Sequence, residues 1–518
     1  MSNRAFDILY LAKQEGIEII LNNDQLQLKL PKNGNIDKYL IEEIKNNKTS
    51  IIDFLRDHKK ISKNGNLISP FDRNSIPHIP LSFGQERLWF IDQLEGSVQY
   101  HIPLIRRLKG SINVNALTFA FRNIINRHEV LRTVIKEIQG EAFQYIKEKN
   151  LWQLDIINDI KYQQDPQTIQ QYVNSLIQLP FDLSKDDMLR ATLVRLGPDE
   201  HILVVVIHHI ASDGWSTPII VKEIKELYAA NIEDRPPKLE SLPIQYADYA
   251  FWQRKYLQGE VLEKKLTYWK QKLEGVADLQ LPIDYKRPDV SSTRGASIRF
   301  TLSKELSEQI QQFIKEQKST VYMTLLAAFK VLLYRYSGQQ DICVGSPIAN
   351  RSQYEVEGLI GLFVNTLALR SEINGEATFT ELLQQVKDST LEAYEHQDVP
   401  FEKVVEVLVK ERDLSRNPLF QVMFSTQNLQ DVSQLQLGEI ELSIIKYENT
   451  TAQFDIAFNI NETPGGMQGA MQYSTDLYNE ATILRMMDHF KELLTSIVKL
   501  PKQKIGLLPM LTVEEEQQ

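Results

Sequence analysis

Only one place in the chain puts two histidines side by side. His208 and His209 follow the aliphatic run 202–207, and Asp213 and Gly214 come shortly after them. The aliphatic run predicts a buried strand, and groups at the end of such a strand are often active-site groups. An imidazole changes its charge near neutral pH, so the pair is a candidate active site. The alternative is a pair of structural histidines that are hydrogen-bonded inside the fold.

The alternation of side chains along a strand gives the two histidines different roles. Neighbouring residues of a strand point to opposite faces, so the two rings cannot readily share one metal ion. If His209 faces a cavity, His208 faces the interior of the fold. Asp213 comes just after the turn, where it is better placed to cap a helix or form a buried salt bridge than to act as a base. We therefore predict no metal site at this motif.

The segment that must position the histidines is long. From residue 81 to about 505, helical periods such as 219–230 interleave with short strands such as 201–207. This pattern predicts an α/β fold. Because about 425 residues exceed what a single hydrophobic core supports, two lobes are expected.

The composition excludes several classes of protein. The chain has 518 residues, of which 42% are hydrophobic and 24% are charged, as in ordinary globular proteins. Its single cysteine, Cys343, allows no internal disulfide and no cysteine-rich zinc site. The formal charge of −10 provides no overall basic surface for nucleic acid. The chain has no apolar run long enough for a membrane span and no signal-peptide core, so we expect a cytoplasmic protein without a membrane partner.

Residues 1–60 are predicted to form a separate small unit with the order αββαα. Two runs of alternating apolar residues flank a turn at 22–24 and predict a β-hairpin. The hairpin residues are Ile17, Ile19, Leu21, Leu26, Leu28 and Leu30. A two-stranded sheet leaves an edge unpaired, so the unit is either a stabilising cap or a docking unit that accepts another chain's tail by β-augmentation. Residues 61–80, rich in Ser, Asn, Pro and Gly, are the expected linker.

The histidine motif resembles a family signature. Residues 208–216 read HHIASDGWS and match the HHxxxDG signature of the condensation domains of nonribosomal peptide synthetases. Six further segments resemble the other motifs of this family, in the same order: 81–90, 127–133, 246–254, 360–366, 396–402 and 412–421. The intact HHxxxDG argues against the cyclising variant, and Trp215-Ser216 argues against an epimerisation domain. Residues 1–60 resemble the TubC-type N-terminal docking domains of the same synthetases.

The resemblance implies a fold and a domain order. The fold is a V-shaped pair of chloramphenicol-acetyltransferase-like lobes, with the first lobe at 81–255 and the second at 256–505. The histidine motif is expected at the cleft, in a tunnel that carrier proteins reach from two faces. Residues 506–518 resemble the start of a linker to an adenylation domain, so the chain is expected to be part of a longer synthetase.

The resemblance also implies a reaction and partners. The α-amine of an acceptor aminoacyl group attacks a donor acyl or peptidyl thioester, and each substrate is carried on a phosphopantetheine arm. No ATP, metal or covalently bound cofactor is expected. The expected partners are donor and acceptor peptidyl carrier proteins, a downstream adenylation domain and the C-terminal tail of an upstream synthetase subunit, which the docking domain binds.

Within the motif, the resemblance assigns a role to each residue. His209 contacts the attacking amine, either as a general base or as a positioning group. His208 and Asp213 are structural, with Arg132 as the suggested partner of the Asp213 carboxylate. Gly214 is expected to allow a close backbone approach and to supply an amide near the reacting carbonyl.

Three alternatives stay open. Asn365 either lines the site from the second lobe or is an ordinary polar residue at a strand end. The chain could be a free-standing acyltransferase that uses coenzyme A, although such an enzyme has no need of a docking unit. It could also be a non-catalytic platform that only recruits carriers, although His209 is intact.

Overall fold

The computed structural model describes most of the chain, in two compact units. The described residues are 18–22, 25–29, 44–45, 47–48, 51–52, 67–158, 166–411, 413–426, 436–438, 440–445, 451–463 and 465–517. The units are Met1–Ser69 and Pro70–Gln518. The large unit contains the histidine motif.

The small unit contains the predicted hairpin. Strands β1 (Glu18–Asn22) and β2 (Gln25–Lys29) pair antiparallel. The register places Ile19 opposite Leu28 and Leu21 opposite Leu26, so the apolar positions fall on the same face, as the alternation predicted. Helical backbone is described at 44–45, 48 and 51–52. The hairpin residues Ile17 and Leu30 lie outside the described residues, and so do the other residues of the predicted helices.

The first lobe of the large unit is built on a six-stranded sheet with the order β14-β15-β4-β9-β8-β7. The bounds are β14 (Gln436–Leu437), β15 (Ile440–Ile444), β4 (His101–Lys109), β9 (Glu200–His208), β8 (Leu189–Arg195) and β7 (Asp155–Ile157). Strand β9 pairs antiparallel with both β4 and β8, and all of its residues after Glu200 are buried. The buried strand predicted at 201–207 is therefore confirmed.

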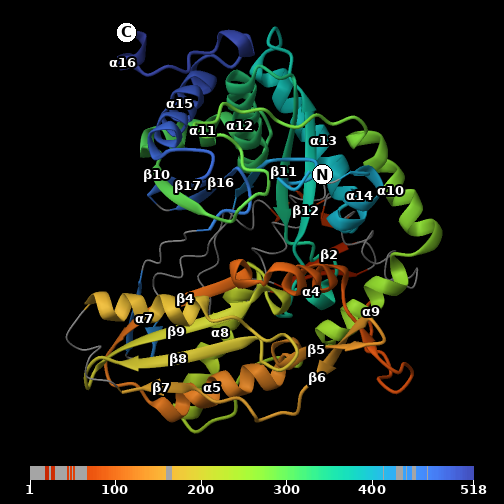
Figure 1. Ribbon diagram of the computed structural model, residues 1–518, viewed down its shortest axis with the longest axis vertical. Coiled ribbons are helices and arrows are strands. Elements are labelled where there is room, and N and C mark those ends of the chain that lie inside the picture. Colours follow the sequence, from red (N-terminus) through yellow and green to blue (C-terminus); the bar gives the residue numbers. More distant parts are fainter. Residues whose placement is uncertain are drawn as a thin grey trace. The chain divides into compact units, whose positions relative to one another are not determined.

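Helices cover the first sheet. Helix α5 (Val114–Arg127) packs against α8 (Ser216–Ile232), and α7 (Pro166–Gln178) contacts β4 and β9 (Figure 1). A smaller sheet in the same unit has the order β3-β6-β5, with β3 (Ile79–Pro80), β6 (Glu141–Ile146) and β5 (Thr133–Ile138). The histidine motif lies in the connection from β9 to α8.

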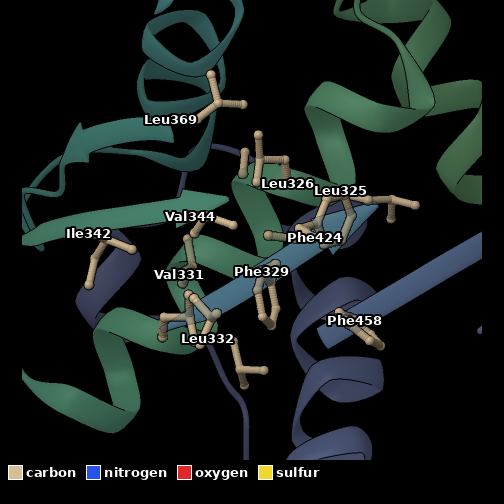
Figure 2. Close-up of a cluster of buried hydrophobic side chains, with 14 of the residues drawn as sticks. Leu325, Leu326, Phe329, Val331, Leu332, Ile342, Val344, Leu369, Phe424 and Phe458 are labelled. Carbon is tan, nitrogen blue, oxygen red and sulfur yellow. The ribbon is translucent and has the colours of Figure 1, made fainter. Parts of the chain in front are cut away.

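The second lobe is built on another six-stranded sheet, with the order β10-β17-β16-β13-β11-β12. The bounds are β10 (Gly295–Thr301), β17 (Gly466–Ser474), β16 (Ile456–Thr463), β13 (Val422–Thr426), β11 (Asp341–Ile348) and β12 (Asn365–Glu372). Helix α12 (Val321–Ser337) forms the centre of its core. Figure 2 shows Phe329 of α12 beside Phe424 and Phe458 of the sheet, with ring centroids 5.5 and 5.2 Å away.

The remaining helices complete the two lobes. They are α4 (Phe83–Glu95), α9 (Tyr246–Tyr256), α10 (Gly259–Leu273), α11 (Lys304–Glu316), α13 (Phe379–Glu395), α14 (Phe401–Leu408), α15 (Glu480–Lys499) and α16 (Val513–Glu516). Short 3-10 turns are η1 (Val98–Tyr100), η2 (Glu129–Arg132), η3 (His209–Ala211), η4 (Tyr354–Val356) and η6 (Ile505–Leu507). The mixed α/β fold predicted from the sequence is confirmed. Among the described helices, none has the length and apolar character needed to cross a membrane.

The predicted division between the lobes at 255/256 is wrong for one segment. Residues 436–444 come late in the chain, yet β15 pairs antiparallel with β4 and extends the first sheet. Without β15, this side of β4 would be an open edge with unpaired backbone groups. A single boundary at 255/256 therefore does not separate the lobes, because the first sheet includes an edge strand from the second half of the chain.

Candidate active site

The histidine motif occupies the end of the central strand and the turn that follows it. His208 is the last residue of β9 and is paired with His101 of β4. The chain then forms the single turn η3 at His209–Ala211, and α8 begins at Ser216. The change from strand to 3-10 turn separates the two imidazole rings, which have different surroundings.

His208 lies in the interior, as predicted, and is 0% exposed. Its Nδ1 accepts the backbone N–H of Ile210 at 3.0 Å, and its Nε2 lies 2.9 Å from Oγ of Ser97. The rings of His101 and Phe181 contact it edge-on. Burial lowers the pKa of His208 to about 3. The ring is therefore neutral near neutral pH, and both of its nitrogens are engaged by the protein.

His209 is only partly buried and is less fully engaged. Its Nδ1 is buried and has no hydrogen-bond partner among the described residues. The ring of Tyr100 lies edge-on to it, with 6.5 Å between the centroids. Burial lowers the pKa of His209, and the carboxylate of Asp213 partly counteracts this effect. The His209 imidazole is therefore also neutral near neutral pH, and it retains hydrogen-bonding capacity that the described protein groups do not use.

Asp213 forms a buried ion pair with the second lobe. Its Oδ1 accepts a hydrogen bond from Nη2 of Arg351 at 3.0 Å, and its Oδ2 accepts the backbone N–H of Phe363 at 3.0 Å. Arg351 follows β11 and Phe363 precedes β12. One carboxylate therefore joins the histidine turn of the first lobe to two segments of the second. The predicted buried salt bridge is present, but the predicted partner, Arg132, is wrong.

Arg132 is bound on its own side of the first lobe. One guanidinium nitrogen lies 3.7 Å from the carboxylate of Glu129, and another donates to the carbonyl oxygen of Lys147. These bonds hold Arg132 at the end of η2. Arg351 is instead held at Asp213 because it sits in the loop after β11, which the fold brings against the start of α8.

Two other residues of the 127–133 segment hold α8 in place. Arg127 and His128 both bind the carboxylate of Glu223 in α8, at 3.1 and 2.9 Å. His128 is 1% exposed, so this contact is buried. The segment therefore supports the helix that follows the histidines.

The start of α8 also contacts the loop before β12. The hydroxyl of Ser216 donates to Oδ1 of Asp213 at 2.7 Å, and its oxygen accepts the backbone N–H of Gly361 at 3.1 Å. Tyr246 of α9 donates its hydroxyl hydrogen to the carbonyl of Leu362 at 2.7 Å. A Cβ at Gly361 would lie 2.1 Å from the Tyr246 ring, so only glycine permits this packing.

The structure also describes the surroundings of two other predicted site residues. A Cβ at Gly214 would have no neighbouring protein atom within 4 Å, so no described residue packs against this glycine, and its role toward the reacting carbonyl stays a prediction. Asn365 donates to the carbonyls of Gln397 and Val399 at 2.8 and 2.7 Å and accepts the N–H of Phe401 at 3.0 Å. Asn365 thus joins the start of β12 to the loop before α14, which favours the structural alternative.

A second ion pair joins the lobes beside the motif. Nη1 of Arg87 in α4 lies 2.8 Å from Oε1 of Glu402 in α14. Both residues belong to segments that the motif comparison had marked, but the pairing itself was not predicted. Ser97, Tyr100 and Arg351 were missed altogether. Only Arg351 had a sequence signal. It follows the strand at 341–348, and a charge that becomes buried there needs a partner.

The chemistry of the site is that of one neutral imidazole on a rigid support. In the ranges that the structure describes, no three His, Cys, Asp or Glu side chains are grouped so that they could hold a metal ion. A neutral imidazole can accept a proton or a hydrogen bond from an amine or a hydroxyl group. The arrangement therefore suits attack by such a nucleophile on an electrophile placed close to His209.

Comparisons with known proteins identify the families to which the two parts of the chain belong. A family model described as "Condensation domain" matches residues 75–518, and one described as "TubC N-terminal docking domain" matches residues 7–57. The chain is 40% identical over 445 residues to gramicidin S synthase 2 of Brevibacillus brevis, a match that covers 85% of this chain and 10% of that protein. The chain therefore spans a small part of the length of this relative.

Solved structures share the fold. The X-domain from teicoplanin biosynthesis superposes with a TM-score of 0.77 at 26% identity, over 86% of this chain and 100% of that one. The condensation domain of a monacolin K polyketide synthase superposes with a TM-score of 0.73 at 24% identity, over 83% of this chain and 99% of that one.

Proposed function

The chain belongs to the condensation-domain family of nonribosomal peptide synthetases and carries a TubC-type docking domain, and from this premise we propose that it joins two carrier-bound substrates by an amide bond. The donor is an acyl or peptidyl thioester, and the acceptor is an aminoacyl thioester with a free α-amine. Each is held on the phosphopantetheine arm of a partner carrier protein. The amine nitrogen bonds to the thioester carbonyl carbon, the C–S bond breaks, and the donor thiol leaves with the proton that the amine loses.

The state of His209 is the observation that carries this proposal. It stands at the end of a rigid strand, it is neutral, and its Nδ1 is not bonded to any described residue. A neutral imidazole is the form that can accept a proton or a hydrogen bond from an attacking amine. His209 is thus the residue that contacts the amine, as a base or as a positioning group.

The protein needs to contribute little to the chemical activation of the two substrates. A thioester is already activated, and an α-amine has a pKa of about 7.7–8.0, so a useful fraction is unprotonated near neutral pH. Holding the two tethered reactants in line can supply about 7–11 kcal/mol of the barrier reduction. Much of the rate is therefore expected from positioning, which the buried contacts around the histidine turn support.

The two domains also imply further binding partners. The docking domain receives the C-terminal tail of an upstream synthetase subunit, which adds a strand to the edge of the β1–β2 hairpin. A downstream adenylation domain and the carriers complete the assembly, and the cytoplasm is the expected compartment.

Two purified carriers test the proposal. One carrier is loaded with N-acetylated aminoacyl groups as donors and the other with free aminoacyl groups as acceptors, over a panel of proteinogenic residues. The full chain should transfer a donor to an acceptor and leave a dipeptidyl thioester on the acceptor carrier, which mass spectrometry detects. Turnover of coenzyme A thioesters without carriers would instead indicate the acyltransferase. Carrier binding without product over the whole panel would indicate the non-catalytic platform.

A further inference from the structure

The end of helix α4 is hydrogen-bonded to the ring of His208. Helix α4 ends at Glu95, Gly96 reverses the chain at a φ of 79°, and Ser97 is then buried beside His208. The Ser97 hydroxyl donates to Oδ1 of Asp92, in the last turn of α4, and its oxygen lies 2.9 Å from Nε2 of His208. Three side chains thus form a continuous chain of hydrogen bonds from α4 to the end of β9.

The directions of these bonds fix the tautomer of His208. Nδ1 accepts the N–H of Ile210, so it carries no hydrogen. The single hydrogen of the neutral ring is therefore on Nε2, from which it is donated to Ser97. Ser97 can accept it because its own hydrogen is directed to Asp92. From Ile210 through His208 and Ser97 to Asp92, each hydrogen-bond donor therefore points to an acceptor.

This tautomer shapes the turn that carries His209. The bond from Ile210 to His208 is the side-chain cap of η3, whose first residue is His209. Ser97 also begins η1, because its carbonyl accepts the N–H of Tyr100 at 2.9 Å, and the Tyr100 ring contacts His209 edge-on. Ser97 therefore contacts both groups that surround His209. Its side chain binds His208, which caps the turn, and its backbone binds Tyr100, whose ring contacts His209.

Packing alone does not explain these residue types. A carboxylate in the last turn of a helix is unfavourable beside the helix dipole, and no basic residue of that turn offsets it. A buried hydroxyl also costs stability unless it is hydrogen-bonded. Apolar side chains would fill the same space without these costs, but they would leave the Nε2 hydrogen of His208 without an acceptor.

We propose that Ser97 and Asp92 are positioning residues for the condensation reaction, which act through the tautomer of His208 to hold His209 at the attacking amine. The inference rests on the proposed role of His209. Ser97 is buried and is bonded to both Asp92 and His208, so substitutions at Ser97 and Asp92 should change the rate of bond formation and the state of His208 together.

The test combines one spectroscopic and one kinetic measurement on the full chain. Two-bond ¹H–¹⁵N spectra of the histidine-labelled protein report the tautomer of His208, whose signals are assigned by their loss in His208→Gln. Single-turnover amide formation between loaded carriers reports the rate. The wild type should show only the Nε2–H tautomer. Ser97→Ala leaves the Nε2 hydrogen without its acceptor, so it should introduce a second tautomer in which the bond from Ile210 is broken, and it should lower the rate by about 10-fold to 100-fold.

Two serine variants separate positioning from structural support. Ser97→Thr keeps the hydroxyl and should restore both the tautomer and the rate. Ser307→Ala removes another buried serine hydroxyl, in α11 of the second lobe, and should leave both measurements unchanged. Should Ser97→Ala fail to fold, Asp92→Ala at a partly exposed position should still introduce the second tautomer, because the Ser97 hydrogen is then free to turn toward Nε2.

Three results would overturn the inference. They are a wild type with the Nδ1–H tautomer, a Ser97→Ala protein with unchanged tautomer and rate, and a loss of rate without a change of tautomer. A His209→Ala protein with the full rate would show that His209 does not act on the attacking amine. If the wild-type chain forms no amide bond between loaded carriers, the proposed function fails instead. The tautomers of the wild-type and Ser97→Ala proteins remain readable in that case, so the two failures can be told apart.

Discussion

Nη2 of Arg351 lies 3.0 Å from Oδ1 of Asp213, and each of the two side chains is only 2% exposed. The Arg351 guanidinium also lies 4.1 Å from the centroid of the Phe363 ring and donates to the carbonyls of Val356 and Leu359. The pair joins the two lobes at Asp213, just after the histidine turn. The geometry of the site therefore depends on the way the lobes meet, as well as on the strand that carries the motif.

Breaking this pair should destabilise the protein strongly. Arg351→Ala leaves the Asp213 carboxylate buried without its cation, and the expected loss in the free energy of unfolding is about 3–5 kcal/mol. Lys504→Ala removes the exposed pair with Glu376 and should cost only about 0–1 kcal/mol. Urea unfolding of both variants measures the difference. Equal losses in the two proteins would show that Arg351 is not a structural partner of Asp213.

The glycine in the loop before β12 should not tolerate a methyl group. At Gly361 a Cβ would overlap the buried Tyr246 ring, so Gly361→Ala should lower the stability by about 1–3 kcal/mol. Gly214→Ala, where the space is open and φ is not positive, should change it by no more than about 0.5 kcal/mol. Thermal unfolding of the two variants is the measurement. A harmless Gly361→Ala substitution would contradict the packing of α9 against this loop.

A buried lysine should make the stability of the second lobe depend on pH. Lys330 of α12 is 0% exposed, and its Nζ donates to the Leu369 carbonyl and the Ser371 hydroxyl, at 2.8 and 2.6 Å. Two acceptors satisfy a neutral amine, whereas an ammonium group would leave one hydrogen unbonded. Burial lowers the pKa of Lys330 to about 7.

The sign of the pH effect follows from this lowered pKa. Between about pH 7 and pH 10 the unfolded chain holds the lysine proton and the folded protein does not, so stability rises with pH by up to about 1.4 kcal/mol per unit. The stability of the wild type relative to Lys330→Met should therefore increase over this window. Lys304→Met, at an exposed site, should show no such trend. A pH-independent difference for Lys330→Met would mean that Lys330 is charged in the fold.

The sequence located the histidine motif well because its signals are local. The aliphatic run before His208 and the alternation of strand residues are properties of adjacent positions, and they predicted both β9 and the burial of His208. The partner of Asp213 is a property of the fold. Arg132 and Arg351 are both arginines of suitable charge, and only the approach of the β11–β12 loop to α8 decides between them.

The same distinction explains the misassigned edge strand. Residues 436–444 have few features that mark them as part of the first lobe, because their pairing with β4 depends on a return of the chain across the lobes. Ser97 was missed for a similar reason. A serine after a helix-ending glycine is unremarkable until the fold places it against His208.

Removing the docking unit should separate recruitment from catalysis. Residues 1–69 form their own compact unit, so a chain that starts at residue 70 should fold and use isolated loaded carriers at nearly the wild-type rate. It should lose binding to a peptide with the sequence of the C-terminal tail of the upstream synthetase, measured by calorimetry. Retained binding of that peptide would place the docking surface elsewhere.

The most direct measurement of the central claim is the single-turnover rate of amide formation by His209→Ala. If His209 contacts the attacking amine as a base, the rate should fall by about 10²- to 10⁴-fold while the unfolding temperature stays close to that of the wild type. His201→Ala is the matched control, since His201 is a buried histidine at the opposite end of β9 whose Nδ1 also has no hydrogen-bond partner in the described part of the chain. Its rate should remain within a few-fold of the wild type. A folded His209→Ala protein that forms the dipeptidyl thioester at the wild-type rate would contradict the account.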